Sequence, residues 1–490
     1  MPAGFSPSEL AYLLPEFVLT LGALLVLLAD AFLSRDRRGA VIGLSLVVLA
    51  ATGAALAWVG APHQTIARGL LSMDAFGLFF KVLVLVAAAL TLLMSGPYLA
   101  AEAMPAGAYS FLVLAATLGM FFMASGVELI TIFIGLETMA VAFYILAGLL
   151  KPNPRSNEAA VKYFLLGAFS LGILLYGMSL LYGLTGSTNL GTIAAAVANP
   201  AAVGRPLLLV AVILVVAGLA FKIAAVPFHM WAPDVYEGAP TPITAFISVG
   251  SKAASFAMLL RIVVLGLPSM AEEWRTLFYV LSVLSMTAGN IAALTQTNLK
   301  RMLAYSSIAH AGYLLIGIVA ATPRGISAML IYLAVYTLMQ LGAFGILVLM
   351  RRGDSAGDEI QDLNGLFQRQ PAAAVAMLVF LLSLGGIPPT AGFMGKFWLF
   401  GAAVEAGYVW LAVVAVLNSV VSLYYYLRVV VAMWTREPEG LEPRMRPALA
   451  LTLALALAGT LVLGLYPRPL FDLAETSAKS LGSAVWAPSR

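Results

Sequence analysis

The sequence of 490 residues contains no cysteine, only three histidines and few charged side chains. Without cysteine the chain cannot form a disulfide, a thiolate zinc site or a cysteine-ligated iron–sulfur cluster. His63, His229 and His310 are too few for a pair of bis-histidine haems. The phosphate-binding pattern GxxxxGK[ST] is missing, as is GxGxxG after a strand. We therefore expect no nucleotide, metal or redox cofactor on this chain.

Hydrophobic residues make up 62% of the chain and charged residues 10%, and the mean hydropathy is +0.98. Soluble proteins are about 45–50% apolar and about 25% charged. A water-soluble fold has too little interior to hide this much apolar surface. The composition excludes a soluble enzyme, a nucleic-acid-binding protein and a disordered chain. It predicts an all-α polytopic membrane protein.

Apolar runs of about 20 residues alternate with short polar breaks, which predicts about fourteen transmembrane helices. The expected spans are 10–33, 40–59, 75–93, 111–123, 129–150, 164–184, 206–226, 243–267, 277–294, 302–321, 326–350, 372–403, 408–434 and 448–465. The first run is followed, not preceded, by arginines, so it does not resemble a cleavable signal peptide.

Lysine and arginine counts predict how the chain crosses the membrane. If both termini lie outside, thirteen of these residues fall in inside loops and seven outside, as the positive-inside rule favours. The inside group is Arg35, Arg37, Arg38, Lys151, Arg155, Lys300, Arg301, Arg351, Arg352, Arg369, Arg436, Arg444 and Arg446. The outside group is Arg68, Arg205, Arg275, Arg324, Arg468, Lys479 and Arg490.

Spans seven and twelve are expected to be broken helices. Pro227 and Pro388 each crowd the carbonyl four residues earlier and leave it without an amide partner. Such a carbonyl is tolerated at membrane depth only beside protein or water. Lys222 and Lys396 adjoin the two breaks. Two interrupted spans five apart are what an internal repeat of five helices would produce.

Four of the charged residues inside or beside the spans are candidates for a site: Glu137, Lys222, Lys252 and Lys396. Each costs roughly 2.5–3.5 kcal/mol on insertion scales, or on the order of 10 kcal/mol together if unpaired. Burial lowers the pKa of a lysine and a nearby carboxylate raises it again, so a Glu–Lys pair of variable separation is a proton-affinity switch. Lysine suits this role because arginine stays charged.

A structural interpretation stays open beside the functional one. A lone intramembrane charge can form an ion pair that fixes helix register. His310 is either a hydrogen-bonded core residue or a relay member, whereas His229, beside Pro227, leans toward function. Lys81 is ambiguous. The following residues are expected to carry no site: Glu128, Lys162, Arg261 and Glu405 as near-interface groups whose charged ends reach water, and Tyr424–Tyr426 as helix packing or an interface belt.

Four stretches resemble the subunit N family of bacterial proton-translocating NADH–quinone oxidoreductase, respiratory complex I. They read NEAAVKYFLLGAFS, YGLTGS, FKIAAVPFHMWAPDVYEGAPTPITAFISVGSKAA and GGIPPTAGFMGKFWLF. The wider group includes other antiporter-like subunits of that complex and Mrp-type cation/proton antiporters. KYFLLGAFS and GIPPTAGFMGKF favour subunit N within it. The resemblance covers about residues 137–397.

The resemblance implies fourteen helices with two inverted five-helix repeats, formed by spans four to eight and nine to thirteen. The expected domains are residues 1–105 with three helices, 106–270 and 271–435 with one repeat each, and 436–490 with the last helix and tail. It also implies that Glu137 pairs with Lys222, that Lys252 and Lys396 are the lysines of spans eight and twelve, and that His229 lies near the first break.

The implied function is one proton channel of a redox-driven translocase in the bacterial inner membrane. NADH, FMN, iron–sulfur clusters and quinone would be bound by partner subunits, and this chain would contact membrane lipid and neighbouring membrane-arm subunits, including antiporter-like ones, but no nucleic acid. The proton would pass from the cytoplasmic side to Lys222 or Lys252 and then near His310 to Lys396. Movement of Glu137 relative to Lys222 would be the input from the neighbouring subunit, and His229 belongs to the same proposed relay. The alternatives are an Mrp-type antiporter subunit, a structural membrane module without a proton path, and an organic-solute symporter.

Overall fold

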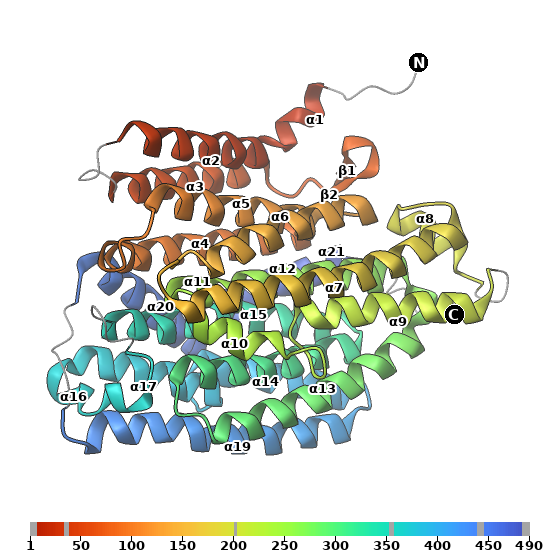
Figure 1. Cartoon of the computed structure of the whole chain (residues 1–490). Helices are drawn as coiled ribbons and strands as arrows, with labels where there is room; N and C mark the ends of the chain where they lie inside the picture. The colour runs from red at the N-terminus through yellow and green to blue at the C-terminus, as the bar shows by residue number, and fades with distance from the viewer. Residues whose placement is uncertain (1–6, 34–38, 200–202, 352–356, 439–444, 483–490) are drawn as a thin grey trace.

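The computed structural model describes residues 7–33, 39–199, 203–351, 357–438 and 445–482. Helices run side by side across the molecule, with α2 and α3 at one edge and α19 at the opposite edge (Figure 1). Thirteen helices in these ranges are long and apolar enough to cross a membrane, and the interrupted pair α17–α18 accounts for one more span. The expected all-α polytopic fold is confirmed.

The first quarter of the chain holds three long helices and a small hairpin. These elements are α1 (Pro7–Tyr12), α2 (Leu14–Phe32), α3 (Gly39–Val59), β1 (Gln64–Ile66), β2 (Leu71–Met73) and α4 (Ala75–Ala101). The strands β1 and β2 pair antiparallel, with Thr65 opposite Ser72. This hairpin was not expected from the sequence.

The next elements reach the end of span eight. They are α5 (Ala106–Ser125), α6 (Leu129–Ala147), α7 (Pro154–Thr185), α8 (Leu190–Ala196), α9 (Arg205–Lys222), α10 (Trp231–Gly238), α11 (Thr241–Phe246) and α12 (Lys252–Leu260). Two π-helical turns, Ile247–Ser251 and Arg261–Gly266, flank α12 and complete one continuous span from Thr241 to Gly266.

The remaining helices form the second half of the bundle. They are α13 (Ala271–Leu294), α14 (Leu299–Ala320), α15 (Pro323–Met350), α16 (Leu366–Arg369), α17 (Pro371–Gly385), α18 (Ala391–Glu405), α19 (Val409–Thr435), α20 (Pro447–Leu465) and α21 (Arg468–Ser480). The polar helix α21 packs on α4 and α15, and the backbone amide of Phe76 donates to Ser480 Oγ at 2.9 Å.

Several helices begin or end away from their expected bounds. α7 starts ten residues before the expected position 164 because the side chain of Asn153 caps it, accepting from the amide of Arg155 at 2.9 Å. α5 starts at Ala106, five residues early, and thereby gains the length to span. α4 continues through Pro97 to Ala101. Polar first turns can be helical because they lie near helix ends and not at membrane depth.

Both expected helix breaks are present. α9 ends at Lys222, and the carbonyl of Phe221 accepts both from the amide of Ala224 at 3.0 Å and from Trp231 Nε1 of α10 at 2.9 Å. α17 ends at Gly385, followed by Gly386 in the left-handed conformation (φ +85°), which favours glycine. The indole of Trp231 therefore binds the backbone at the first break, and a left-handed turn ends the helix at the second.

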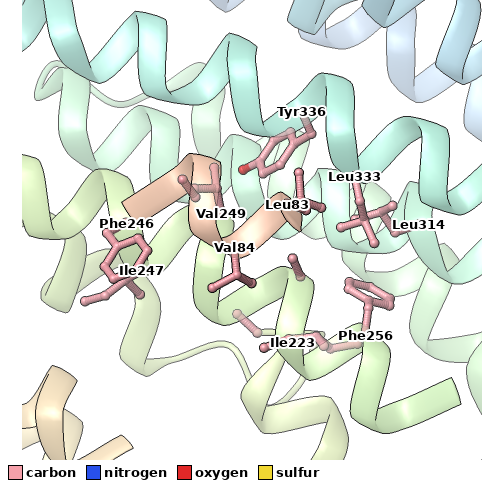
Figure 2. Close-up of a cluster of buried hydrophobic side chains, with 14 of the residues drawn as sticks. Leu83, Val84, Ile223, Phe246, Ile247, Val249, Phe256, Leu314, Leu333 and Tyr336 are labelled. Carbon is pink, nitrogen blue, oxygen red and sulfur yellow. The ribbon is translucent and has the colours of Figure 1, made fainter. Parts of the chain in front are cut away.

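The central helices are almost completely buried, whereas the outer ones face the surroundings. In the most apolar 18-residue window, 94% of the residues are buried in α14 and in α15, against 33% in α2. Figure 2 shows part of this core, where Leu83 of α4, Val249 of span eight and Leu333 of α15 converge around the hydroxyl-bearing Tyr336. The other side chains labelled in this view are apolar.

A buried ion pair joins the N-terminal helices to span eight. The guanidinium of Arg261 donates to both carboxylate oxygens of Asp74, at 2.7 and 2.8 Å, and its Nε donates to the carbonyl of Ala124 at 3.0 Å. Burial alone would raise the pKa of Asp74, but the charge of Arg261 and hydrogen bonds from Arg261, Ser72 and Gly77 lower it overall.

The expectation that Arg261 and Glu128 reach water is wrong. Arg261 is only 1% exposed because Asp74 neutralises it inside the protein. Glu128 is buried because its carboxylate caps α6 by accepting from the amide of Thr131 at 2.8 Å. Lys162 and Glu405 do have exposed side chains. Composition alone cannot distinguish a snorkelling arginine from a paired one.

Replacing Arg261 by methionine should destabilise the protein strongly, since Asp74 would remain as an unpaired buried carboxylate. Removing one partner of a buried pair costs about 3–5 kcal/mol. The double variant Arg261→Met, Asp74→Leu should recover much of the lost stability. Thermal unfolding of the membrane complex in detergent would measure this. Lys479→Met, which breaks an exposed pair with Glu475, is the control; equal losses in both single variants would contradict the prediction.

Candidate functional site

Four of the six candidate residues are buried among the central helices. Lys222 ends α9, Lys252 starts α12, His310 lies in α14 and Lys396 lies in the second turn of α18. None of the four is more than 5% exposed. The charged or titratable ends of these side chains therefore depend on protein atoms and internal water for solvation.

Lys252 lies at the centre of a cluster of hydroxyl groups. Its Nζ donates to both the carbonyl and the Oγ of Ser307, each at 2.5 Å. Tyr336 donates to the same Oγ at 2.9 Å, and the hydroxyl of Tyr236 lies 3.3 Å from it. The ammonium group also lies 5.5 Å from the centre of the Tyr336 ring, a cation–π contact. Side chains of α10, α14 and α15 thus surround the lysine of α12.

His310 continues this polar row one helical turn beyond Ser307. Its Nδ1 lies 2.7 Å from the hydroxyl of Tyr332, and its Nε2 lies 3.1 Å from that of Tyr426. The hydroxyl of Tyr426 is also 2.5 Å from Ser306 Oγ. Both ring nitrogens therefore have a partner that can donate or accept a proton.

Lys396 uses the second helix break. Its Nζ donates to the carbonyl of Gly385 at 3.1 Å, which is free because α17 ends there. It also lies 4.7 Å from the centre of the Tyr313 ring. A Cβ on Gly386 would approach the Lys396 side chain to 2.9 Å, so glycine makes room for it. The break supplies both an acceptor and space.

Lys222 at the end of α9 and Glu137 of α6 form no salt bridge with each other in the described part of the chain. Lys222 Nζ instead lies 3.4 Å from the hydroxyl of Tyr144, which is two turns along α6 from Glu137. Glu137 is half-buried, and its Oε1 has no hydrogen-bond partner among the described residues. The pair expected from the resemblance is therefore separated, with Tyr144 beside the lysine.

His229 lies in the break after α9, as expected, but makes no described hydrogen bond to the other five candidates. It is half-buried, and its Nδ1 has no hydrogen-bond partner within the described ranges. No hydrogen bond described there joins it to Lys222 or Lys252.

Charged side chains gather at the end of the bundle where α10 and α14 meet. Asp234 accepts from Lys162 at 2.6 Å and from Arg301 at 2.7 Å, and Glu237 also accepts from Arg301 at 3.0 Å. The buried Lys300 Nζ lies 3.8 Å from Asp358 Oδ2. Burial raises the pKa of Asp358 above its ordinary value, although the charge of Lys300 opposes this.

The hydroxyl groups of the site were missed in the sequence. Ser307, Tyr332 and Tyr336 contact the candidate residues directly, and Tyr426, expected to serve packing or an interface belt, is buried against His310. Serines and tyrosines at helical spacing around His310 are the signal that could have indicated them. Among the residues that the structure describes, no group of three or more histidine and acidic side chains could hold a metal ion.

Comparison with known proteins identifies the family. A family profile described as NADH:quinone oxidoreductase/Mrp antiporter, TM, matches residues 126–422. NADH-quinone oxidoreductase subunit N of Trichlorobacter lovleyi is 44% identical over 478 residues, covering 97% of this chain and 98% of that protein. Subunit N 1 of Koribacter versatilis is 47% identical over 501 residues, covering 99% and 98%. The chain belongs to the subunit N family of NADH-quinone oxidoreductases.

Solved structures agree with this family. A chain of respiratory complex I from Thermus thermophilus, with bound aureothin, is 35% identical to this subunit N family member, with a TM-score of 0.80 over 94% of this chain and 99% of that one. A chain of the Mrp complex from Dietzia sp. DQ12-45-1b has the same TM-score but 24% identity, covering 98% of each chain, which shows the fold alone. The resemblance to subunit N is confirmed, and it is closer than the likeness to this Mrp chain.

Proposed function

We propose that this chain is the proton-translocating subunit N of a bacterial NADH-quinone oxidoreductase, and that its buried lysine row carries the proton. Identity of 44% and 47% to subunit N proteins over nearly their whole length supports the complex. The observation that supports the path is the hydrogen bond from Lys252 to Ser307. Tyr336 donates to the same serine hydroxyl, and its ring contacts the ring of His310. NADH oxidation and quinone reduction take place in other subunits of the complex.

Within this proposal, partner subunits supply the chemistry that this chain lacks. The chain lies in the bacterial inner membrane beside other membrane-arm subunits, including antiporter-like ones, and both termini face outward. FMN, iron–sulfur clusters and quinone belong to those partners. The division into two five-helix repeats, 106–270 and 271–435, is part of the same proposal.

The relay runs from Lys222 or Lys252 through the hydroxyl row to Lys396. Ser307, Tyr336 and the two tyrosines on His310 can each accept one proton while releasing another. No hydrogen bond in the described part of the chain joins Lys222 to Lys252 or His310 to Lys396, so water must carry the proton across those two intervals. The titrations of the three lysines are coupled, and the row shares its protons as a unit.

Glu137 is the input of this mechanism. Its half-buried position at the side of α6 allows a neighbouring subunit to alter its distance from Lys222. A closer carboxylate holds the lysine proton, and a more distant one releases it. Transfer of one charge against the membrane potential requires about 2.3 kcal/mol per 100 mV, comparable to about 2.7 kcal/mol for a change of two pKa units.

Replacing Lys222 by alanine should lower coupled quinone reduction and proton pumping by about a hundredfold, the lower end of what a positioned proton-transfer group contributes. The complex should still assemble, because alanine leaves only the hydroxyl of Tyr144 without its partner. Pumping by the complex in proteoliposomes would be measured with a pH-sensitive dye. Lys151→Ala, in an exposed loop, is the control. Pumping at the control rate would remove Lys222 from the path.

Replacing Lys396 by glutamate should block proton exit, since the carbonyl of Gly385 would then face a carboxylate instead of an ammonium group. The flavin content of the purified complex reports how much of it assembles. We expect proton pumping to fall by a larger factor than this flavin content. The exposed substitution Lys479→Glu should change neither quantity. Unchanged pumping in Lys396→Glu would show that Lys396 is structural, and loss of assembly alone would favour a purely structural module.

The lack of cysteine makes the orientation testable directly. Lys151→Cys should be protected from a membrane-impermeant maleimide in intact cells, and Ala198→Cys should be labelled, because these exposed loops lie on opposite sides if both termini are outside. Permeabilised cells should show labelling of both. The reverse pattern would overturn the proposed orientation without affecting the relay.

A further inference from the structure

Gln340 is a fully buried amide with no protein partner. It lies in α15, is 0% exposed, and neither its side-chain nitrogen nor its side-chain oxygen has a hydrogen-bond partner in the described part of the chain. No other residue described there leaves two buried side-chain atoms unpaired in this way. An unpaired amide is costly to bury, and proteins satisfy such groups with ordered water.

The position of Gln340 relates it to Lys252. Residues four apart on a helix share a face about one turn, or 5.4 Å, apart. Gln340 therefore lies one turn from Tyr336, whose hydroxyl donates to Ser307 Oγ, the partner of Lys252. Gln340 is on the side of Tyr336 toward Met350, where α15 ends. On the other side, one turn away, Leu333 closes the core with apolar atoms (Figure 2).

Two more unpaired polar atoms belong to segments that contact α15 or follow it in the chain. Thr241 Oγ1 is buried without a hydrogen-bond partner at the start of α11, which packs against α15. Asp358 Oδ1 is also buried and unpaired, while Oδ2 of the same carboxylate is 3.8 Å from Lys300 Nζ. Lys300 also donates to the carbonyl of Ala239 at 2.7 Å, two residues before Thr241. Buried polar atoms without a hydrogen-bond partner thus occur on α15 itself, on α11 packed against it, and in the segment that follows it.

We propose that Gln340 binds ordered water that connects the Lys300–Asp358 pair to the Lys252 cluster and forms an inlet for protons from the inner side. This inference rests on the proposed function and adds the direction and residues of the supply. Gln340 is a positioning residue: its amide holds one water as donor and another as acceptor, while the proton moves between waters. Thr241 and Asp358 bind the waters of the same row that lie nearer the inner side.

Gln340→Met tests the inlet, because methionine has similar volume and cannot hold the water. We expect proton pumping by the whole complex in proteoliposomes to fall about fivefold, as loss of one ordinary hydrogen bond would cause. The solvent isotope effect on pumping should rise, since proton supply becomes rate-limiting. A defect of packing alone would not change the isotope effect. Gln340→Ser leaves a hydroxyl group and room for water, so this variant should retain most of the wild-type pumping rate.

Thr337→Val is the matched control. Thr337 is buried on the same helix, but its hydroxyl donates to the carbonyl of Leu333 at 2.8 Å and needs no water. It should pump at the wild-type rate with the wild-type isotope effect. If Gln340→Met fails to assemble, Thr241→Val, an isosteric loss of the second water partner, decides the question. A wild-type rate and isotope effect in the variant tested would overturn the inlet.

Lys252→Met separates this inference from the proposed function. If Lys252→Met abolishes pumping while Gln340→Met behaves as wild type, the relay stands and the inlet is wrong. If Lys252→Met pumps normally, the relay itself fails, and the inlet fails with it.

Discussion

An ammonium group in an apolar interior must find acceptors, and this requirement organises the centre of the molecule. Lys252 meets it with both oxygens of Ser307, Lys396 with a carbonyl freed by a helix break, and Lys222 with a tyrosine hydroxyl. Each acceptor is neutral. A lysine held by neutral acceptors keeps a proton less firmly than one held by a carboxylate, which is what a group that must release its proton requires.

The permanently paired charges lie elsewhere. Arg261 and Asp74 form a bidentate pair at the junction between the N-terminal helices and span eight, and Lys81 pairs with Glu16 at 2.6 Å between α2 and α4. These pairs hold neighbouring helices together. Ion pairs thus serve attachment at the margins of the fold, whereas unpaired lysines occupy its centre.

The broken helices connect fold and site. An intact helix satisfies its own carbonyls and offers nothing to a side chain. At Gly385 the interruption releases an acceptor for Lys396. At the end of α9 the carbonyl of Phe221 accepts from Trp231 as well as from a backbone amide, and Trp231 stacks on Tyr163 at a ring separation of 4.6 Å. The breaks therefore provide polar positions that the bilayer itself cannot provide.

The sequence by itself determined the class of fold and the charged residues, because hydrophobic length, proline breaks and intramembrane lysines are local properties of the chain. It indicated Lys222, Lys252, Lys396 and His310, and its motifs indicated the family. Only the tertiary structure decided what surrounds them. Ser307, Tyr336 and Gln340 are ordinary residues of apolar helices until packing brings α12, α14 and α15 together, and Arg261 differs from a snorkelling arginine only through Asp74, 187 residues away. A hydrogen-bond partner distant in sequence is fixed by packing and not by local pattern.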